Sequence, residues 1–312
     1  MAYTDREDLN YLGELFLIGN TQTPFLNRIG GLGGARAKIS RSFIFPVAQP
    51  WSLASASQPA ITEAQSVTGQ TPTTVARGQD TNTVQIFQKA VESSYAKQST
   101  YGEISGLAAL GTQPVTDELA FQKQAQLRQI AIDAEYSMLN GAYQASANAS
   151  TAAKMRGILT AISTNAVDAS SASLIKSLVD VLLRSMAANG AQFEDMWCYA
   201  NALQKQLLTD IYGNQTQNDN RGGMNVTQIE TDFCMLNVQY APNVPTDTLG
   251  IFDMAYVYPV FCPVPGKPGG GLMFYEEKMK AGASVGGQFY GQIGIDYGPE
   301  EYHGKITGLA TT

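Results

Sequence analysis

A single histidine and three cysteines are the residues of this 312-residue chain best suited to nucleophilic or metal chemistry. His303 lies in the polar segment GPEEYHGK, where we expect an exposed turn. A Ser–His–Asp site would have to use this histidine, and no G-x-S-x-G motif supplies the serine. Cys198, Cys234 and Cys262 lie far apart, so we expect buried, reduced thiols and no zinc site.

Adjacent acidic residues offer the other route to catalysis. Glu276–Glu277 and Glu300–Glu301 are adjacent in sequence, so in a strand the carboxylates of each pair would point to opposite faces and not together as in a glycosidase. Two distant carboxylates could still meet in the fold, which leaves a hydrolase open as an alternative. We otherwise predict no enzyme, and no catalytic, cofactor-binding or metal-binding residue.

The composition indicates contacts with protein and argues against nucleic-acid binding. The net charge is −7, whereas a protein that binds phosphates needs a basic face. Charged residues make up 15% of the chain, against about 25% in typical soluble proteins. Interface centres are depleted in charge in the same way, although secreted or glycosylated proteins share this composition. The N-terminus does not resemble a signal peptide and no segment approaches a membrane span, so we expect a soluble protein made in a cytosol.

A long helix predicted over residues 116–140 organises the chain. Thr116 is a suitable N-cap, acidic residues follow it in the first turn, and Asn140–Gly141 ends the helix. Its apolar residues form two nearly opposite stripes: Leu119, Leu127, Ile130, Ala134 and Met138, and Phe121, Ala125, Ile132, Tyr136 and Leu139. A surface helix shows one such stripe. Either this helix is central to a larger α+β domain, or its second stripe contacts a neighbouring subunit.

Two predicted strands, 38–51 and 81–95, enclose some thirty residues that cannot form a core. Phe43 and Phe45 share one face of the first strand. A long coreless segment inside a compact domain is uncommon, so we expect either a disordered loop or a projecting hairpin arm. Residues 1–30 are too few to bury their own apolar side chains and must dock on another element.

Basic residues gather near the front of the chain. Arg28, Arg36, Lys38 and Arg41 fall in a stretch without acids, which runs from Glu14 to Glu63. Acidic residues collect later, at Glu230, Asp232, Glu276, Glu277, Glu300 and Glu301. A basic arm and an acidic body fit contacts between copies of one chain, although solvated charges placed by chance would look the same.

The rest of the chain alternates helices and strands without a regular βαβ rhythm, which indicates an α+β fold. We expect a helix over 171–190, a buried strand at 193–201, a helix ending at Gly213, a hairpin over 225–240, one buried strand over 248–264 and a β-rich tail.

Four segments, in order, resemble the Hong Kong 97-type major capsid protein of tailed bacteriophages. They are TNTVQIFQKAVESSYAKQSTYG (81–102), ELAFQKQAQLRQIAIDAEYSMLNGAYQ (118–144), KMRGILTAISTNAV (154–167) and IETDFCMLNVQYAPNVPTDTLGIFDMAYVYPVF (229–261). The E-Y-x-x-L-N-G ending of the second is the most telling, and the RG-I-L-x-x-I step supports it. The match is to an architecture, because none of these is a catalytic signature.

The resemblance implies an α+β capsid fold with defined parts. These are an N-terminal arm (1–34), an extended two-stranded loop lying over a neighbouring subunit (35–95), a peripheral domain (96–167 and 285–312) around the spine helix 116–140, and an axial domain (168–284). The implied function is a structural major capsid protein that self-assembles through pentamers and hexamers into an icosahedral head. That head encloses a double-stranded DNA phage genome without sequence-specific binding.

The implied partners are further copies of the chain, a portal protein, a separate scaffolding protein and a decoration protein, with no membrane. We expect the protein in the virion, assembled in the bacterial host cytoplasm. The residues predicted to contact other subunits are Arg36, Lys38, Arg41, Phe43, Phe45, Trp51, Phe121, Ile132 and Tyr136. The three basic ones are expected to dock on acids of an adjacent subunit. Another phage structural component, such as a tail or decoration protein, is the main alternative.

Overall fold

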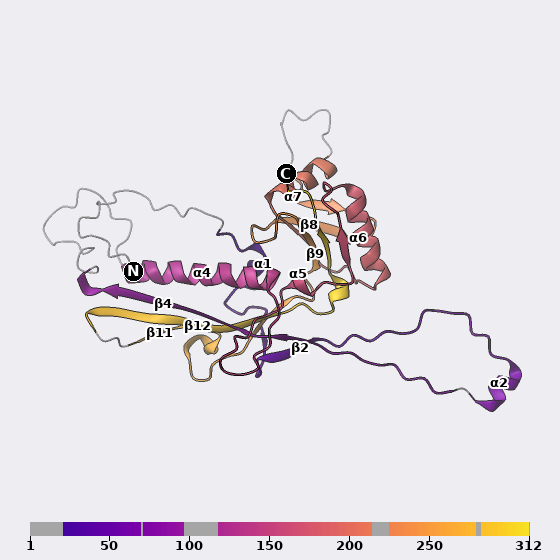
Figure 1. Ribbon diagram of the computed structural model, residues 1–312, viewed down its shortest axis with the longest axis horizontal. Helices are drawn as coiled ribbons and strands as arrows, with labels where there is room; N and C mark the ends of the chain where they lie inside the picture. Colours follow the sequence, from indigo (N-terminus) through magenta and orange to yellow (C-terminus); the bar gives the residue numbers. More distant parts are fainter. Residues whose placement is uncertain (1–20, 70, 97–117, 214–224, 279–281, 312) are drawn as a thin grey trace.

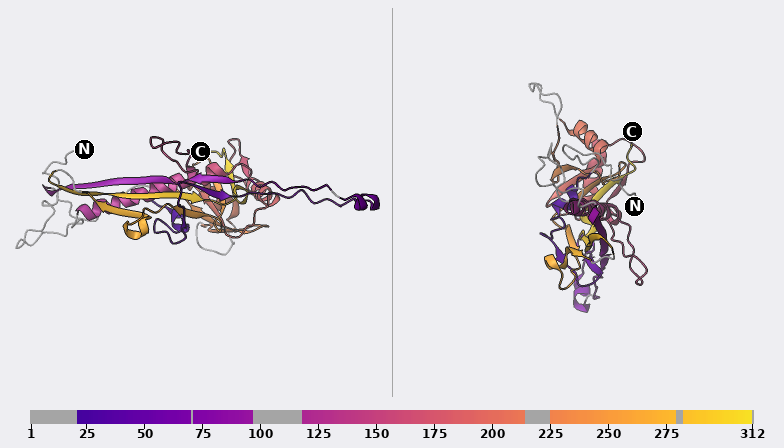
Figure 2. Two further views of the ribbon diagram at one scale, coloured as in Figure 1. Left: turned by 90° about the horizontal axis from the view of Figure 1, so that it is seen from below. Right: turned by 90° about the vertical axis from the view of Figure 1, so that its left-hand side faces the viewer.

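The computed structural model describes residues 21–69, 71–96, 118–213, 225–278 and 282–311. Within these ranges the chain forms an elongated body of helices and sheets, from which one long arm projects (Figure 1). Figure 2 shows the same arm from a second direction, continuing along the long axis well beyond the body. The predicted α+β class is confirmed.

Two sheets and a short ribbon make up the β structure. The five-stranded sheet contains β1 (Lys38–Ile39), β10 (Tyr258–Phe261), β12 (Ser284–Asp296), β11 (Met273–Glu277) and β4 (Gln85–Ser94). The six-stranded sheet runs in the order β5 (Ala166–Asp168), β13 (Gly304–Thr307), β9 (Leu249–Asp253), β6 (Met196–Ala200), β8 (Met235–Tyr240) and β7 (Gln228–Glu230). The ribbon pairs β2 (Ile44–Ala48) with β3 (Asp80–Thr83) at the base of the arm.

Helices pack on these sheets or stand at the arm tip. They are α1 (Pro24–Arg28), α2 (Glu63–Thr68), α4 (Glu118–Asn140), α5 (Ile158–Ala161), α6 (Lys176–Ala188) and α7 (Ala202–Tyr212), with 3-10 turns at Pro268–Gly271 and Glu300–Tyr302. The predicted helices at 171–190 and before Gly213 are confirmed as α6 and α7, and the predicted hairpin at 225–240 is confirmed as β7–β8.

The long helix α4 lies along β4 and β12, which pair with each other over their length (Figure 1). It ends at Asn140 as predicted, and the first two residues of the predicted helix fall outside the described ranges. Glycine is required at position 141, because a Cβ there would lie 2.4 Å from the Ser137 carbonyl oxygen and 2.5 Å from that of Met155. The chain therefore turns closely against its own loop at the end of α4.

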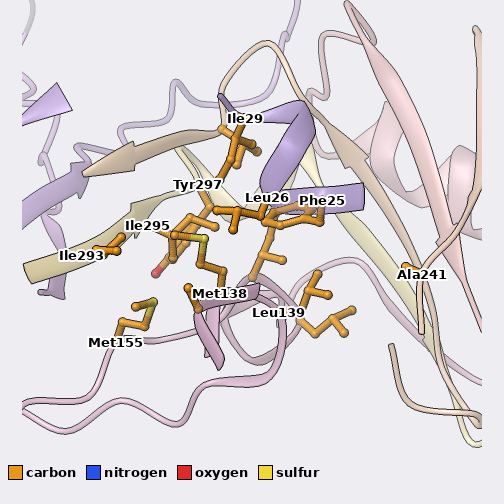
Figure 3. Close-up of a cluster of buried hydrophobic side chains, with 14 of the residues drawn as sticks. Phe25, Leu26, Ile29, Met138, Leu139, Met155, Ala241, Ile293, Ile295 and Tyr297 are labelled. Carbon is orange, nitrogen blue, oxygen red and sulfur yellow. The ribbon is translucent and has the colours of Figure 1, made fainter. Parts of the chain in front are cut away.

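One hydrophobic core lies between α4, α1 and the five-stranded sheet (Figure 3). Figure 3 shows Met138 and Leu139 of α4 close to Leu26 of α1 and Ile295 of β12. The segment at Phe25–Ile29 thus docks on the body, as predicted for the front of the chain. The apolar residues predicted to dock from positions 11–18 lie outside the described residues.

A second core lies between the six-stranded sheet and the helices α6 and α7. Alternate residues of β6 serve the two cores: Met196 and Cys198 face the second core, and Tyr199 faces the first. The strand is buried on both faces, which explains its continuous apolar sequence.

Several strand predictions need correction. The segment 81–95 divides, because only β3 pairs with β2 while β4 pairs with β12. The single strand expected over 248–264 is two strands, β9 and β10, which belong to different sheets. Within the sheets, β10 and β11 lie in the five-stranded sheet with β12, and β13 lies in the six-stranded sheet.

Candidate assembly surfaces

The histidine is a structural residue, and its predicted exposure is wrong. His303 is fully buried. Its Nδ1 accepts a hydrogen bond from the Asp253 amide at 3.1 Å, and its Nε2–H donates to the Tyr297 carbonyl at 2.5 Å. Burial lowers the pKa of this imidazole, which both hydrogen bonds hold in one neutral tautomer. The ring joins β9 to the segment before β13.

The cysteines differ in exposure. Cys198 is buried, and burial raises its pKa to about 12, so its thiol is protonated at neutral pH. Cys234 and Cys262 are only half-buried, which corrects the expectation of three buried thiols. Among the described residues, no three His, Cys, Asp or Glu side chains come together as a metal site. No helix in the described ranges is long and apolar enough to span a membrane.

The acidic pairs stabilise the fold of their own chain. The Glu300 carboxylate accepts hydrogen bonds from the amides and hydroxyls of Ser163 and Thr164, at 2.5–3.3 Å. Partial burial alone would raise its pKa, but these hydrogen bonds outweigh burial and hold the pKa below its usual value. Glu276 forms an ion pair with Lys267 at 2.5 Å.

Two of the three basic residues predicted to dock on a neighbour have partners within the chain. Lys38 Nζ lies 2.5 Å from the Asp296 carboxylate. The Arg36 guanidinium donates to the Met254 carbonyl at 3.2 Å and lies over the Tyr258 ring. Arg41 is exposed and makes no ion pair with another described residue. Docking onto a neighbour therefore stays a prediction, for which Arg41 is the best placed of the three.

The aromatic residues near the base of the arm divide in the same way. Phe45 is buried against Val84 and Val260, and Phe43 is half-buried beside them. Trp51 is 61% exposed, where the arm leaves its ribbon. Phe45 therefore stabilises this subunit, and Trp51 is free to contact another one.

The arm beyond Trp51 makes no core contact with its own body. Every described residue from Trp51 to Gln79 is exposed (Figure 1). At its tip, a capping box between Thr62 and Gln65 starts the short helix α2. The exposed large apolar side chains of the arm are Trp51, Leu53, Ile61, Val67 and Val75. Because so short a helix is marginal alone, the arm needs a surface to pack on.

The second stripe of α4 offers such a surface. Tyr136 is 58% and Phe121 38% exposed, and Ile132 is half-buried, although Leu139 of the same stripe is buried in the core. A groove of about 530 Å³ runs beside Tyr136 and Ile132, between α4 and residues 85–89 of β4. We call it the α4 groove. Among the described residues, most of this stripe therefore remains at least partly exposed.

A buried carboxylate on α4 was missed in the sequence. Helical periodicity places Glu135 between the two apolar stripes, where an exposed side chain is expected, but it is fully buried. It accepts hydrogen bonds from the Leu26 amide at 3.1 Å and from Asn243 Nδ2 at 3.2 Å. Burial raises its pKa to about 7, and these hydrogen bonds lower it only in part. Nothing local in the sequence marks it, because both partners lie about a hundred positions away.

Comparison with known proteins identifies the family to which the chain belongs. A family model described as SU10 major capsid protein matches residues 2–310. The chain belongs to this family. No curated protein matches it.

Solved structures agree on the fold. The capsid of cyanophage A-1(L) superposes with a TM-score of 0.66 at 10% identity, covering 99% of this chain and 98% of that one. The capsid of a native GTA particle gives 0.61 at 11% identity, covering 99% and 100%. The SrpI encapsulin of Synechococcus elongatus PCC 7942 gives 0.59 at 10% identity, covering 100% and 98%. The expected Hong Kong 97-like capsid fold is confirmed, and family membership assigns the chain a structural role in a virion capsid shell.

Proposed function

We propose that copies of this capsid protein assemble through pentamers and hexamers into an icosahedral head that encloses double-stranded DNA. The observation that carries the proposal is the arm, whose five large apolar side chains are each 52–84% exposed. Family membership supports a shell, and the incompleteness of the isolated chain supports its construction from identical copies. Interfaces within such rings are head to tail and close by rotation.

In this shell the arm lies over a neighbouring subunit and covers the exposed stripe of α4. Fully burying a large aliphatic or aromatic side chain stabilises a contact by about 1.5–3 kcal/mol, so several half-exposed ones on the arm and on α4 suffice for a weak interface. Contacts of about 4–8 kcal/mol become a stable shell when every copy is held from many sides. Weak individual contacts also let misplaced subunits dissociate.

The proposed domains follow the two sheets. The six-stranded sheet with α6 and α7 forms the axial domain, directed towards the centre of each ring. The five-stranded sheet with α4 forms the peripheral domain. Residues 1–34 form the N-terminal arm and residues 35–95 the extended loop.

The remaining partners follow from the proposed head. A portal protein, a separate scaffolding protein and a decoration protein complete it, and assembly takes place in the cytoplasm of the bacterial host. The net charge of −7 supports a shell that encloses DNA without sequence-specific binding.

Sedimentation and electron microscopy of the purified chain test this proposal. We expect closed particles or capsomers for the whole chain, expressed alone or with its scaffold. A variant with residues 52–76 replaced by a short Gly-Ser turn should keep its circular dichroism spectrum yet yield only small oligomers. Tubes or fibres from the whole chain would instead favour a tail component. A compact monomer at every concentration would contradict the proposal.

A further inference from the structure

The two lateral edges of the six-stranded sheet carry different surfaces. On one side the sheet ends at the edge strand β7, which forms a hairpin with β8. On the other side α6 packs on β13 and β5. Figure 1 shows α6 on the outer, right-hand side of this sheet. The hairpin and α6 thus occupy opposite ends of one domain.

The surface of α6 that faces away from the sheet is apolar and basic. Ile175 precedes the helix and is 51% exposed, and Val181 is 41% exposed. Lys176 and Arg184 are exposed on the same element, and neither makes an ion pair with another described residue. The one acid of this helix, Asp180, is half-buried. The pKa of Tyr212 in α7 is raised to about 12, chiefly by burial and further by the charge of the nearby Asp180. We call Ile175, Lys176, Val181 and Arg184 the α6 patch.

The hairpin at the other edge is apolar and acidic. Met235 is 56% and Phe233 44% exposed. Glu230, paired directly with Met235 across the hairpin, and Asp232 are both exposed, and neither forms an ion pair with another described residue. We call Glu230, Asp232, Phe233 and Met235 the hairpin patch.

The hairpin patch is held in place at a cost in backbone strain. Phe193 has a φ of 56°, a left-handed conformation that is unfavourable for an aromatic residue. In that conformation its ring stacks on the ring of Phe233, with centroids 5.8 Å apart. Strain of this kind persists where the surrounding structure fixes it, and it gathers at functional positions. Here it orders an aromatic side chain that remains open to solvent.

We propose that the hairpin patch of one copy docks on the α6 patch of the next copy in the ring. This rests on the proposed function and names the lateral contact between axial domains. Phe233 and Met235 pack on Ile175 and Val181, while the acids Glu230 and Asp232 face the bases Lys176 and Arg184. Both patches combine exposed apolar area with charged side chains that form no ion pair with another described residue, and the two sets of charges are opposite in sign.

The charges also fix the polarity of the contact. Two hairpin patches would bring four carboxylates together, and two α6 patches would bring four cations together, so neither patch can pair with itself. The contact is therefore heterologous. Because the patches lie at opposite edges, each copy offers one to the neighbour before it and the other to the neighbour after it, which is the arrangement that closes a ring.

Charge reversal tests the contact. The variants E230K/D232K and K176E/R184E should each fold as the wild type does by circular dichroism, since all four side chains are exposed. Each should lower the yield of sedimenting particles by about tenfold or more, because every copy then meets its neighbour with like charges. The variant that carries all four changes should assemble again.

Matched controls distinguish the loss of this contact from a general effect of changed surface charge on assembly. Lys154→Glu and Asp210→Lys reverse exposed charges outside both patches, where neither side chain makes an ion pair with another described residue, and should leave the yield unchanged. If the two patch variants assemble like these controls while the wild type forms shells, this inference is wrong and the proposed function stands. If the wild type forms no shell or capsomer, the proposed function itself fails.

Mixing the two double variants tests the polarity. Copies with two basic patches and copies with two acidic patches can alternate around a ring only when the ring has an even number of members. The mixture should therefore give hexamers, whereas pentamers should be lost, because an odd ring leaves one pair of like patches. Equal formation of both rings by the mixture would contradict a head-to-tail contact.

A disulfide provides a test independent of charge. In assembled particles, Val181→Cys combined with Met235→Cys should give a ladder of covalent oligomers under mild oxidation, read on a non-reducing gel. Either single variant is the control for the native cysteines, of which Cys234 adjoins Met235. Assembled particles of the double variant that show no more cross-linking than the single variants would overturn the proposal.

Discussion

The carboxylate of Glu135, near the C-terminal end of α4, accepts a hydrogen bond of 3.1 Å from the backbone amide of Leu26 in α1. Its second oxygen accepts from Asn243 Nδ2 at 3.2 Å, in the loop between β8 and β9. One buried side chain thus joins the front of the chain, the long helix and the domain of the six-stranded sheet. The core around it is otherwise apolar, so the carboxylate is held at a cost in desolvation.

Because Glu135 is buried at this position, we expect the stability of the protein to depend on pH in a specific way. Burial raises the pKa of Glu135 to about 7 in the folded chain, above its ordinary value of 4.5. Between these values the folded state binds a proton that the unfolded state has lost, so the free energy of unfolding falls as pH rises from 4.5 to 7. We expect a loss of up to about 3 kcal/mol, complete above pH 7.

The variant Glu135→Gln isolates this effect. Its amide oxygen can still accept from Leu26, but it does not titrate, so the extra pH dependence should vanish. Urea denaturation of unassembled protein at pH 5 and pH 8 measures the difference between wild type and variant, and other titrating groups cancel in that comparison. Parallel curves for the two proteins would show that Glu135 does not titrate in this range.

Adding one methyl group in the turn after α4 should markedly lower the free energy of unfolding. Gly141→Ala brings a Cβ within 2.4 Å of a backbone carbonyl that cannot move without disturbing the helix end. We expect a loss of about 1–3 kcal/mol or more in the free energy of unfolding. Gly33→Ala is the matched control, because a Cβ there meets nothing within 4 Å and its φ is not positive. Equal stability of the two variants would contradict the close approach.

Features fixed by local signals were accessible from the sequence, whereas those fixed by distant contacts were not. The end of α4 and its two stripes follow from the Asn140–Gly141 stop and from 3.6-residue periodicity. The pairing of β4 with β12 joins residues some two hundred positions apart, and no residue type in either strand specifies it. Likewise the break between β9 and β10 lies inside one continuous apolar run.

The burial of two titratable groups was inaccessible for the same reason. His303 lies in a polar segment of the sequence and Glu135 falls between the two apolar stripes of its helix, yet each meets buried amides or carbonyls from other elements. Of the predicted contact residues, Phe45 and Lys38 contact residues far along their own chain, while Trp51 and Tyr136 are more than half exposed. The resemblance to capsid proteins predicted the fold, but it did not predict which residue each side chain contacts.

We expect substitutions of Lys38 and Arg41 to have different effects, the first on stability and the second on assembly. Lys38→Gln removes the partner of Asp296, whose side chain is only 6% exposed, so it should lower the free energy of unfolding by about 1–2 kcal/mol. Arg41→Glu reverses an exposed charge and should leave that free energy within about 0.5 kcal/mol. If Arg41 docks on an acid of a neighbour, particle yield should fall in this variant alone at temperatures where both proteins are folded. An unchanged yield for Arg41→Glu would remove Arg41 from the predicted contacts.

Substitutions at two nearby positions of α4 should distinguish effects on folding from effects on assembly. Tyr136 is largely exposed and Met138 is fully buried, although they lie two residues apart on one helix. Met138→Ala leaves a cavity beside Ile130 and Ala134 and should lower the free energy of unfolding by about 2–5 kcal/mol.

Tyr136→Ser opens no cavity, so the unassembled chain should unfold as the wild type does. In the proposed shell, however, it removes an aromatic side chain from the surface covered by the arm of a neighbour. Particle yield should therefore fall for Tyr136→Ser without any loss of stability, measured by sedimentation beside urea denaturation of the same preparation. Normal particles from this variant would mean that the arm packs elsewhere than the α4 groove.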